Sequence, residues 1–131
     1  MADLVLDTHA CVFAALSPRK LGRRARAAIR RVEAGKDVAW IPAVVAAELV
    51  MLTERGRTRY GLPQLSETIA DVPGLSFLPL DLEQVDAFSA LASIADPFDR
   101  LIVAAARVTG AKLISRDEAI AELGVVDVVW D

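Results

Sequence analysis

Short apolar segments that alternate with helical stretches are the feature that most limits the fold of this chain. Strands are predicted at residues 3–7, 38–41, 75–78, 112–115 and 125–130. These segments are mostly apolar along their length and do not alternate, as expected when both faces of a sheet are covered. Helical stretches between successive strands are typical of parallel pairing. The sequence therefore predicts a three-layer α/β fold with a mainly parallel central sheet flanked by helices.

The helices are predicted from capping residues and helix breakers. Ser17 is expected to cap a basic helix over 19–34, with Gly35 as its C-terminal stop. The remaining helices are expected over 8–16, from Pro42 to Arg55, over 63–70, over 82–93, from Pro97 to Gly110, and over 118–123. The whole chain of 131 residues fits one domain, since domains most often have about 100–150 residues.

Four isolated carboxylates occupy positions where an apolar segment begins, ends or is interrupted. Asp7 follows the first strand and Asp117 follows the fourth, while Glu48 and Asp99 lie on helices. Ligands of such sheets bind beyond the carboxyl ends of the strands, so we expect the four acids to converge there. A carboxylate against a core is costly unless it is paired, hydrogen-bonded or bound to metal. The pattern therefore indicates a hard-cation site built from oxygen ligands.

Each acid except Glu48 also fits a purely structural role. Asp7, Asp96 and Asp117 are natural N-caps, and the helix dipole favours Asp99 at the third position of its helix. Glu48 has no capping role, because it lies within a helix and its neighbours one turn away on either side are apolar. Glu48 is therefore the strongest single indication of a functional site.

The charge distribution is uneven although the formal net charge is only −3. Residues 19–59 hold 11 of the 15 basic residues and four of the 18 acidic ones. Such an asymmetry fits a face that binds a polyanion, and it fits a solvated helix face equally well. The hydrophobic fraction of 54% exceeds the roughly 45–50% of typical domains. This excess predicts apolar surface that a partner or a second copy would cover.

Several other classes of protein are excluded. The single cysteine, Cys11, permits no internal disulfide and fits a reducing, cytoplasmic setting. No apolar run approaches the roughly 20 residues of a membrane span, and residues 1–3 lack the basic region of a secretion signal. A Gly-rich phosphate loop is missing, and His9 is the only histidine. The chemistry is therefore expected to rest on carboxylates.

The ordered set of motifs resembles the PIN domain, and within it most closely the VapC toxins of prokaryotic toxin–antitoxin pairs. The motifs are Leu6-Asp7-Thr8-His9-Ala10, Glu48 in an apolar helix, Asp96-Pro97-Phe98-Asp99-Arg100-Leu101-Ile102, and Ile114-Ser115-Arg116-Asp117. The resemblance covers nearly the whole chain and implies a single PIN domain over residues 1–131. It also implies an endoribonuclease that depends on Mg²⁺ or Mn²⁺, forms a homodimer, and is held inactive by a small VapB-like antitoxin.

The resemblance also assigns roles to individual residues. It implies that Asp7, Glu48, Asp99 and Asp117 are the catalytic and metal-binding acids. Supporting positions are Thr8, Asp96, Arg100 and Ser115. The pair Ile94-Ala95 departs from relatives, which often carry a histidine and a basic residue there. From the charge distribution, the residues expected to bind RNA are Arg23, Arg24, Arg55 and Arg57.

Two other functions remain open at this level. One is a PIN nuclease of RNA processing that has no antitoxin, and the other is a non-catalytic PIN-like module that binds RNA or protein. The intact set of four acids argues against the binding module. For an antitoxin, apolar residues around Val50 together with segment 57–74 are expected to form a groove.

Overall fold

A five-stranded parallel sheet forms the centre of the computed structural model, which describes residues 1–131. The strands are β1 (Asp3–Leu6), β2 (Val38–Pro42), β3 (Leu75–Leu78), β4 (Lys112–Ile114) and β5 (Val128–Val129). Their order is β3-β2-β1-β4-β5, and every neighbouring pair is parallel. The predicted parallel α/β fold is confirmed, and β1 is its central strand.

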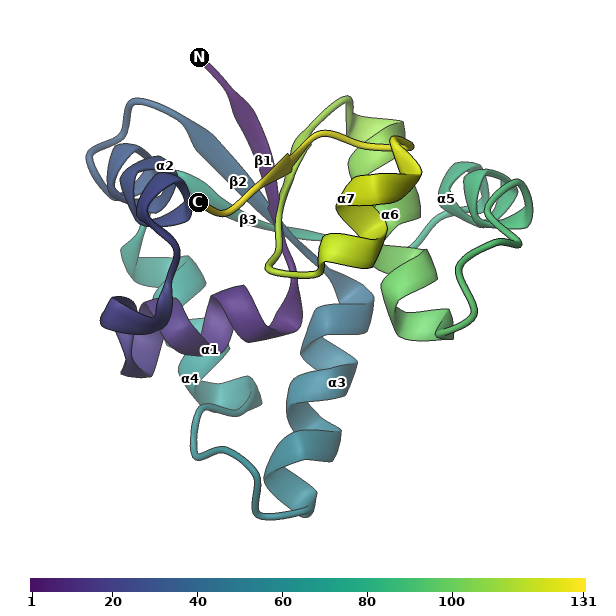
Figure 1. The fold of residues 1–131 in the computed structure, drawn as a ribbon. Helices are drawn as coiled ribbons and strands as arrows, with labels where there is room; N and C mark the ends of the chain where they lie inside the picture. The colour runs from purple at the N-terminus through teal and green to yellow at the C-terminus, as the bar shows by residue number, and fades with distance from the viewer.

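Seven α-helices surround the sheet (Figure 1). They are α1 (Thr8–Leu16), α2 (Arg23–Glu33), α3 (Ala43–Glu54), α4 (Leu62–Asp71), α5 (Leu82–Ser89), α6 (Pro97–Thr109) and α7 (Glu118–Leu123). Helices α1, α2 and α4 lie on one side of the sheet, α5, α6 and α7 lie on the other, and α3 projects from the carboxyl end of the strands. None of the helices combines the length and the apolar character that crossing a membrane requires.

The core occupies both faces of the sheet. On β1, Leu4 and Leu6 face α1, α2 and α4, where they line a cavity. Val5 points to the opposite face because successive side chains of a strand alternate, and it is completely buried. Helix α6 packs against β1 and β4 there, and its residues 102–106 are all buried. Burial on both faces explains why the strand sequences do not alternate.

The basic segment after α1 differs from the prediction of one helix over 19–34. Residues Pro18–Lys20 form a 3₁₀ turn, and α2 begins only after Gly22. Ser17 makes no capping hydrogen bond from its side chain. The start of α2 is instead set by Trp130, whose carbonyl oxygen accepts a 2.9 Å hydrogen bond from the amide of Ala25. The start of α2 could not be predicted from neighbouring residues, because its capping carbonyl comes from the far end of the chain.

Two further elements are shorter than predicted. Helix α5 ends at Ser89 and not at residue 93, because the backbone turns so that Leu91 and Ile94 are buried. The last strand is limited to Val128–Val129, which pair with β4. The expected strand began at Val125, but the carbonyl of that residue accepts a hydrogen bond from the Arg107 guanidinium and is not part of the ladder.

Candidate active site

Asp7 lies directly after β1 and begins α1. Its carboxylate accepts a 2.8 Å hydrogen bond from the amide of Ala10 and therefore caps the helix. Burial raises the pKa of Asp7 above its ordinary value. The hydrogen bonds from Ala10 and from the Ser115 hydroxyl oppose this rise, as do the charges of His9 and Arg116. Asp7 is thus both a helix cap and an acid at the carboxyl end of the central strand.

Glu48 is joined to the residue that follows Asp7. It lies in the second turn of α3, and its Oε1 accepts a 2.5 Å hydrogen bond from the hydroxyl of Thr8. Thr8 is 2% exposed and therefore has a fixed position at the start of α1. The one ion pair of the chain joins Arg31 and Asp37, so no cation neutralises Glu48. The mid-helix carboxylate is held at the end of β1 by a hydroxyl and not by a charge.

Asp96 and Asp99 have different roles at the start of α6. Asp96 is the N-cap, and its Oδ1 accepts hydrogen bonds from the amides of Phe98 (2.8 Å) and Asp99 (3.2 Å). The side chain of Asp99 makes no hydrogen bond within the protein and is half-buried. The sequence placed Asp96 as a cap, and this role is what the structure shows.

The charges of the other acids affect the pKa of Asp99. Its pKa is raised to about 6, first by burial and then by the charges of Asp96, Asp117, Glu48 and Asp7. Like charges disfavour the ionised form at short range, so Asp99 must lie within electrostatic reach of all four. The two strand ends and the two helices therefore place their carboxylates within electrostatic reach of Asp99.

Asp117 completes the group at the end of β4. Its Oδ1 accepts hydrogen bonds from the amides of Ala119 (2.9 Å) and Ile120 (3.2 Å) and caps α7. Its own amide donates a 3.1 Å hydrogen bond to the hydroxyl oxygen of Ser115. Ser115 is 1% exposed, and its hydroxyl also lowers the pKa of Asp7. One buried hydroxyl thus connects the ends of β1 and β4.

The donor atoms of this site suit a hydrated hard cation. They are carboxylate and hydroxyl oxygens, which Mg²⁺ prefers. The caps use Oδ1 of Asp7 and of Asp117, and leave Oδ2 of each outside the cap. No group of three or more His, Cys, Asp or Glu side chains is arranged to hold a metal ion directly. Mg²⁺ usually takes only one or two carboxylates and keeps several waters, so this spread-out set fits an ion held partly through water.

Arg100, predicted as a supporting residue, is engaged by α5. Its Nε donates a 2.9 Å hydrogen bond to the carbonyl of Phe88, and its guanidinium lies 3.9 Å from the centroid of the Phe88 ring. A cation at this distance from an aromatic face is attracted to it. Arg100, next to Asp99, therefore connects the start of α6 to α5.

The four arginines predicted to bind RNA are all exposed. Arg23 and Arg24 lie in the first turn of α2, whereas Arg55 and Arg57 follow α3. Arg55 comes seven residues after Glu48, which is about 10 Å along a helix at 1.5 Å per residue. The two pairs thus belong to different elements. Their contact with RNA stays a prediction.

Sequence reasoning gave no functional role to two residues near Asp7. His9 and Arg116 both lower the pKa of Asp7 and are exposed. The available signal was the position of Arg116 between Ser115 and Asp117 in the segment after β4. Charge clustering along the sequence pointed to residues 19–59 and missed a single arginine that the fold brings to the site.

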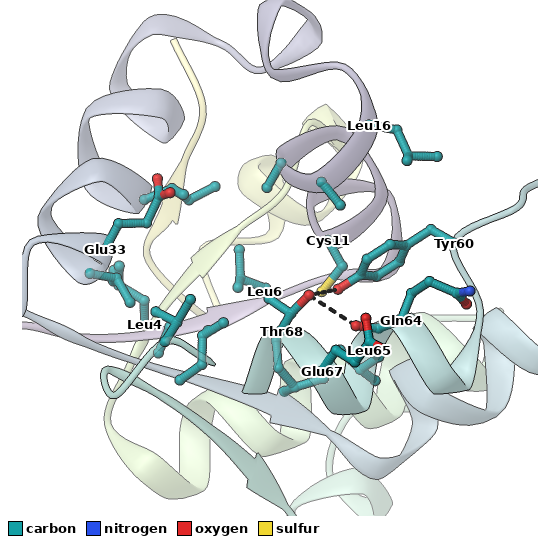
Figure 2. A pocket seen from close by; sticks show the side chains of 18 residues that line it. Leu4, Leu6, Cys11, Leu16, Glu33, Tyr60, Gln64, Leu65, Glu67 and Thr68 are labelled. Carbon is teal, nitrogen blue, oxygen red and sulfur yellow. Dashed lines mark hydrogen bonds between the residues drawn. The ribbon is translucent and has the colours of Figure 1, made fainter. Parts of the chain in front are cut away.

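An apolar cavity of about 350 Å³ lies between α1, α2, α4 and the sheet (Figure 2). It is lined by 18 residues, of which 14 are hydrophobic. Leu4, Leu6 and Cys11 contribute to its wall, and Tyr60 donates a 2.7 Å hydrogen bond to Thr68. The cavity takes in part of segment 57–74, but its other walls are α1 and α2 and not the part of α3 that was predicted to form a groove.

The sequence matches the family model of the PIN domain over residues 4–126. The chain belongs to the PIN domain family. PIN domains are nucleases and generally use divalent metal ions. No curated protein matches the sequence of this PIN domain.

Several solved structures share this fold. VapBC2 from Rickettsia felis, bound to a DNA fragment from its promoter, has a TM-score of 0.73 and 17% identity, covering 98% of this chain and 99% of that chain. FitAcB from Neisseria gonorrhoeae has a TM-score of 0.68 and 18% identity, covering 95% of each chain. A toxin–antitoxin complex from Klebsiella pneumoniae has a TM-score of 0.62 and 16% identity, covering 94% of each. At these identities the likeness concerns the fold of this PIN domain.

Proposed function

We propose that this PIN domain is a divalent-metal-dependent endoribonuclease and the toxin of a toxin–antitoxin pair. The observation that carries the proposal is the gathering of Asp7, Glu48, Asp99 and Asp117 with no cation paired to any of them. Carboxylates without ion-pair partners at one place are costly, and a bound divalent cation would offset this cost. The fold relatives, which include a toxin–antitoxin complex, support the assignment as a toxin.

The residues of this chain would prepare an RNA phosphodiester for attack by water. Oδ2 of Asp7 and of Asp117 would hold a hydrated ion, and Thr8 would keep Glu48 turned toward it. When bound, Mg²⁺ or Mn²⁺ would supply a more acidic water and neutralise the leaving oxygen. The buried hydroxyl of Ser115 would fix the relative positions of Asp7 and Asp117. No side-chain nucleophile is needed, and water attack would give a 5′-phosphate and a 3′-hydroxyl.

Cleavage of single-stranded RNA in the presence and absence of Mg²⁺ or Mn²⁺ tests this proposal. The wild-type chain should cut RNA with metal and stop when a chelator is added. Asp7→Asn and Asp99→Asn should both remove cleavage. Asp127→Asn is a suitable control, because Asp127 is an exposed acid that precedes β5 at the opposite end of the sheet. RNA that stays intact with both metals would contradict the proposal.

The cavity supports a small antitoxin as the partner. Its lining is mainly apolar, and it also contains the carboxylates of Glu33 and Glu67. A segment with apolar side chains flanked by Lys or Arg would match both properties, in the manner of a helix in a groove. Burial, and after it the charge of Asp7, raises the pKa of the Cys11 thiol in the cavity wall. Co-purification of a small basic partner would separate a toxin from an RNA-processing nuclease.

Exposed apolar side chains in the loop after β3 and on the first turn of α5 support a homodimer. Leu80, Leu82 and Val85 are 49%, 84% and 43% exposed, respectively. Burial of apolar surface lowers the free energy by roughly 25 cal/mol per Å². A second copy of the chain would cover these side chains. Light scattering should give a dimer for the wild-type chain and a monomer for Leu82→Lys. A monomeric wild-type chain would contradict this assignment without affecting the nuclease.

A further inference from the structure

Two exposed cations meet at one aromatic ring. The ring of Phe13 on α1 has the guanidinium of Arg116 at 5.1 Å and the ammonium of Lys20 at 5.5 Å from its centroid. Phe13 itself is only 9% exposed and packs against Trp130, with centroids 6.4 Å apart. The ring is therefore a fixed support that holds two charges from separate segments, one from the turn before α2 and one from the segment after β4.

This pair lies beside the acidic cluster. Arg116 is the neighbour of Asp117 in the chain and lowers the pKa of Asp7. The ring of His9, two residues after Asp7, is 6.1 Å from the Phe13 ring. Exposed charges act over about 8 Å at physiological ionic strength. Arg116 is thus a cation whose field reaches the site where RNA would be cut.

The protein leaves both cations available. Neither Lys20 nor Arg116 has a carboxylate within ion-pair distance or donates a side-chain hydrogen bond. Their attraction to Phe13 uses the ring face and leaves the N–H donors free. In contrast, Arg107 donates to a backbone carbonyl, and Arg31 is paired with Asp37. A planar guanidinium with free donors matches the oxygens of a phosphate in a bidentate manner.

We propose that Lys20 and Arg116, both held by Phe13, form a phosphate-binding subsite that keeps the RNA strand beside the acids. The inference rests on the proposed ribonuclease function and adds a substrate contact to it. Four carboxylates repel a polyanion, and only cations close to them can offset this repulsion after salt screening. The subsite therefore binds a phosphate that flanks the scissile bond, and it lies apart from the predicted contacts at Arg55 and Arg57.

The salt dependence of RNA binding tests the subsite. Binding of a fluorescein-labelled single-stranded RNA is measured in Mg²⁺ over a series of salt concentrations, in an Asp99→Asn background that prevents cleavage. Each phosphate contact contributes about 0.7 to the slope of log K against log salt for single strands. Because the two cations share one phosphate, Arg116→Gln and Lys20→Gln should each reduce the slope, and the double variant should reduce it by about 0.7 in total. Arg116→Lys should keep most of the slope because it keeps the charge.

Lys112→Gln is the matched control. Lys112 is exposed at the first residue of β4, whereas Arg116 follows the other end of the same strand. Its replacement should leave the slope unchanged, and thermal melts should show that all variants are folded. If both single variants keep the parental slope and affinity while the wild-type chain binds and cleaves RNA, the subsite is wrong and the ribonuclease stands. If the wild-type chain neither binds nor cleaves RNA, the proposed function and the subsite fail together.

Discussion

The hydroxyl of Thr8 donates a 2.5 Å hydrogen bond to Oε1 of Glu48, a residue 40 positions later in the chain. Thr8 follows Asp7 directly, so this bond ties the acid of α3 to the acid at the end of β1. A hydroxyl can orient a carboxylate without neutralising its charge, which leaves Glu48 able to act on a cation. Thr8 is therefore a positioning residue for Glu48.

Replacement of Thr8 should affect cleavage more than folding. Thr8→Val keeps the shape of the side chain and removes the hydrogen bond to Glu48. We expect a loss of about 10–100-fold in activity, the usual cost of removing a partner that orients a metal ligand. Thr8→Ser should retain most of the activity because it keeps the hydroxyl. Cleavage rates at fixed Mg²⁺ measure the effect, and equal rates for Thr8→Val and the wild-type chain would show that Thr8 does not position Glu48.

Asp99 should make the metal-free protein less stable as pH rises. Its pKa in the folded chain is about 6, above the ordinary value of 3.8, so the folded state binds the proton more tightly than the unfolded chain. The resulting stabilisation is complete below pH 3.8 and is lost as the pH rises through about 6. In a chelator, the melting temperature should fall over this interval, and it should fall less for Asp99→Asn.

At neutral pH the same substitution should raise the melting temperature of the metal-free protein, because it removes one of several like charges. Asp127→Asn serves as the control, since Asp127 is an exposed acid outside the cluster. Parallel curves for the wild-type chain and Asp99→Asn would show that Asp99 is not coupled to the other acids.

A charge placed in the apolar cavity should separate antitoxin binding from catalysis. Ala15 is exposed on α1 and lines the cavity. Ala15→Glu should weaken the binding of the partner, because a carboxylate would lose water without gaining a hydrogen bond. RNA cleavage by the free chain should stay unchanged. Ala27→Glu on the exposed side of α2 is the control, and calorimetric titration is the measurement. Unchanged affinity for Ala15→Glu would move the partner to another surface.

Gly22 should be intolerant of any side chain. A Cβ atom at this position would overlap the carbonyl oxygen of Trp130 and lie 2.6 Å from the carbonyl carbon. Gly22→Ala must displace Trp130 and weaken its hydrogen bond with Ala25, so we expect destabilisation by about 1–3 kcal/mol. Urea unfolding checks this value. A variant as stable as the wild-type chain would mean that the Trp130 segment can move freely.

Much of the fold could be predicted because its signals are local. Asp7, Asp96 and Asp117 mark helix starts with their own side chains, and each caps the expected helix. The apolar strands identify a sheet that is covered on both faces. The start of α2 could not be predicted, because it depends on the carbonyl of Trp130. Sequence reasoning also missed the walls of the cavity, since α1 and α2 reach segment 57–74 only through the packing of the whole face.

The candidate site shows the same division between local and distant causes. Strand ends identify Asp7 and Asp117 as neighbours because parallel strands share one carboxyl edge. The apolar surroundings of Glu48 mark it as unusual, but its bond to Thr8 appears only in three dimensions. The attachment of Arg100 to Phe88 also depends on tertiary packing. The charge distribution indicated residues 19–59 as the basic segment. It did not indicate Arg116, because a single arginine gives no compositional signal.

The position of β1 in the sheet has a consequence for the order in which the fold assembles. This strand precedes β2 and β4 in the chain and pairs with both, so that Val5 lies opposite Trp40 and Leu113. Contacts between residues so distant in sequence form late and slow the folding of a chain. The acid at the end of β4 therefore joins the acid at the end of β1 only after the central strand has paired with a segment more than a hundred residues away.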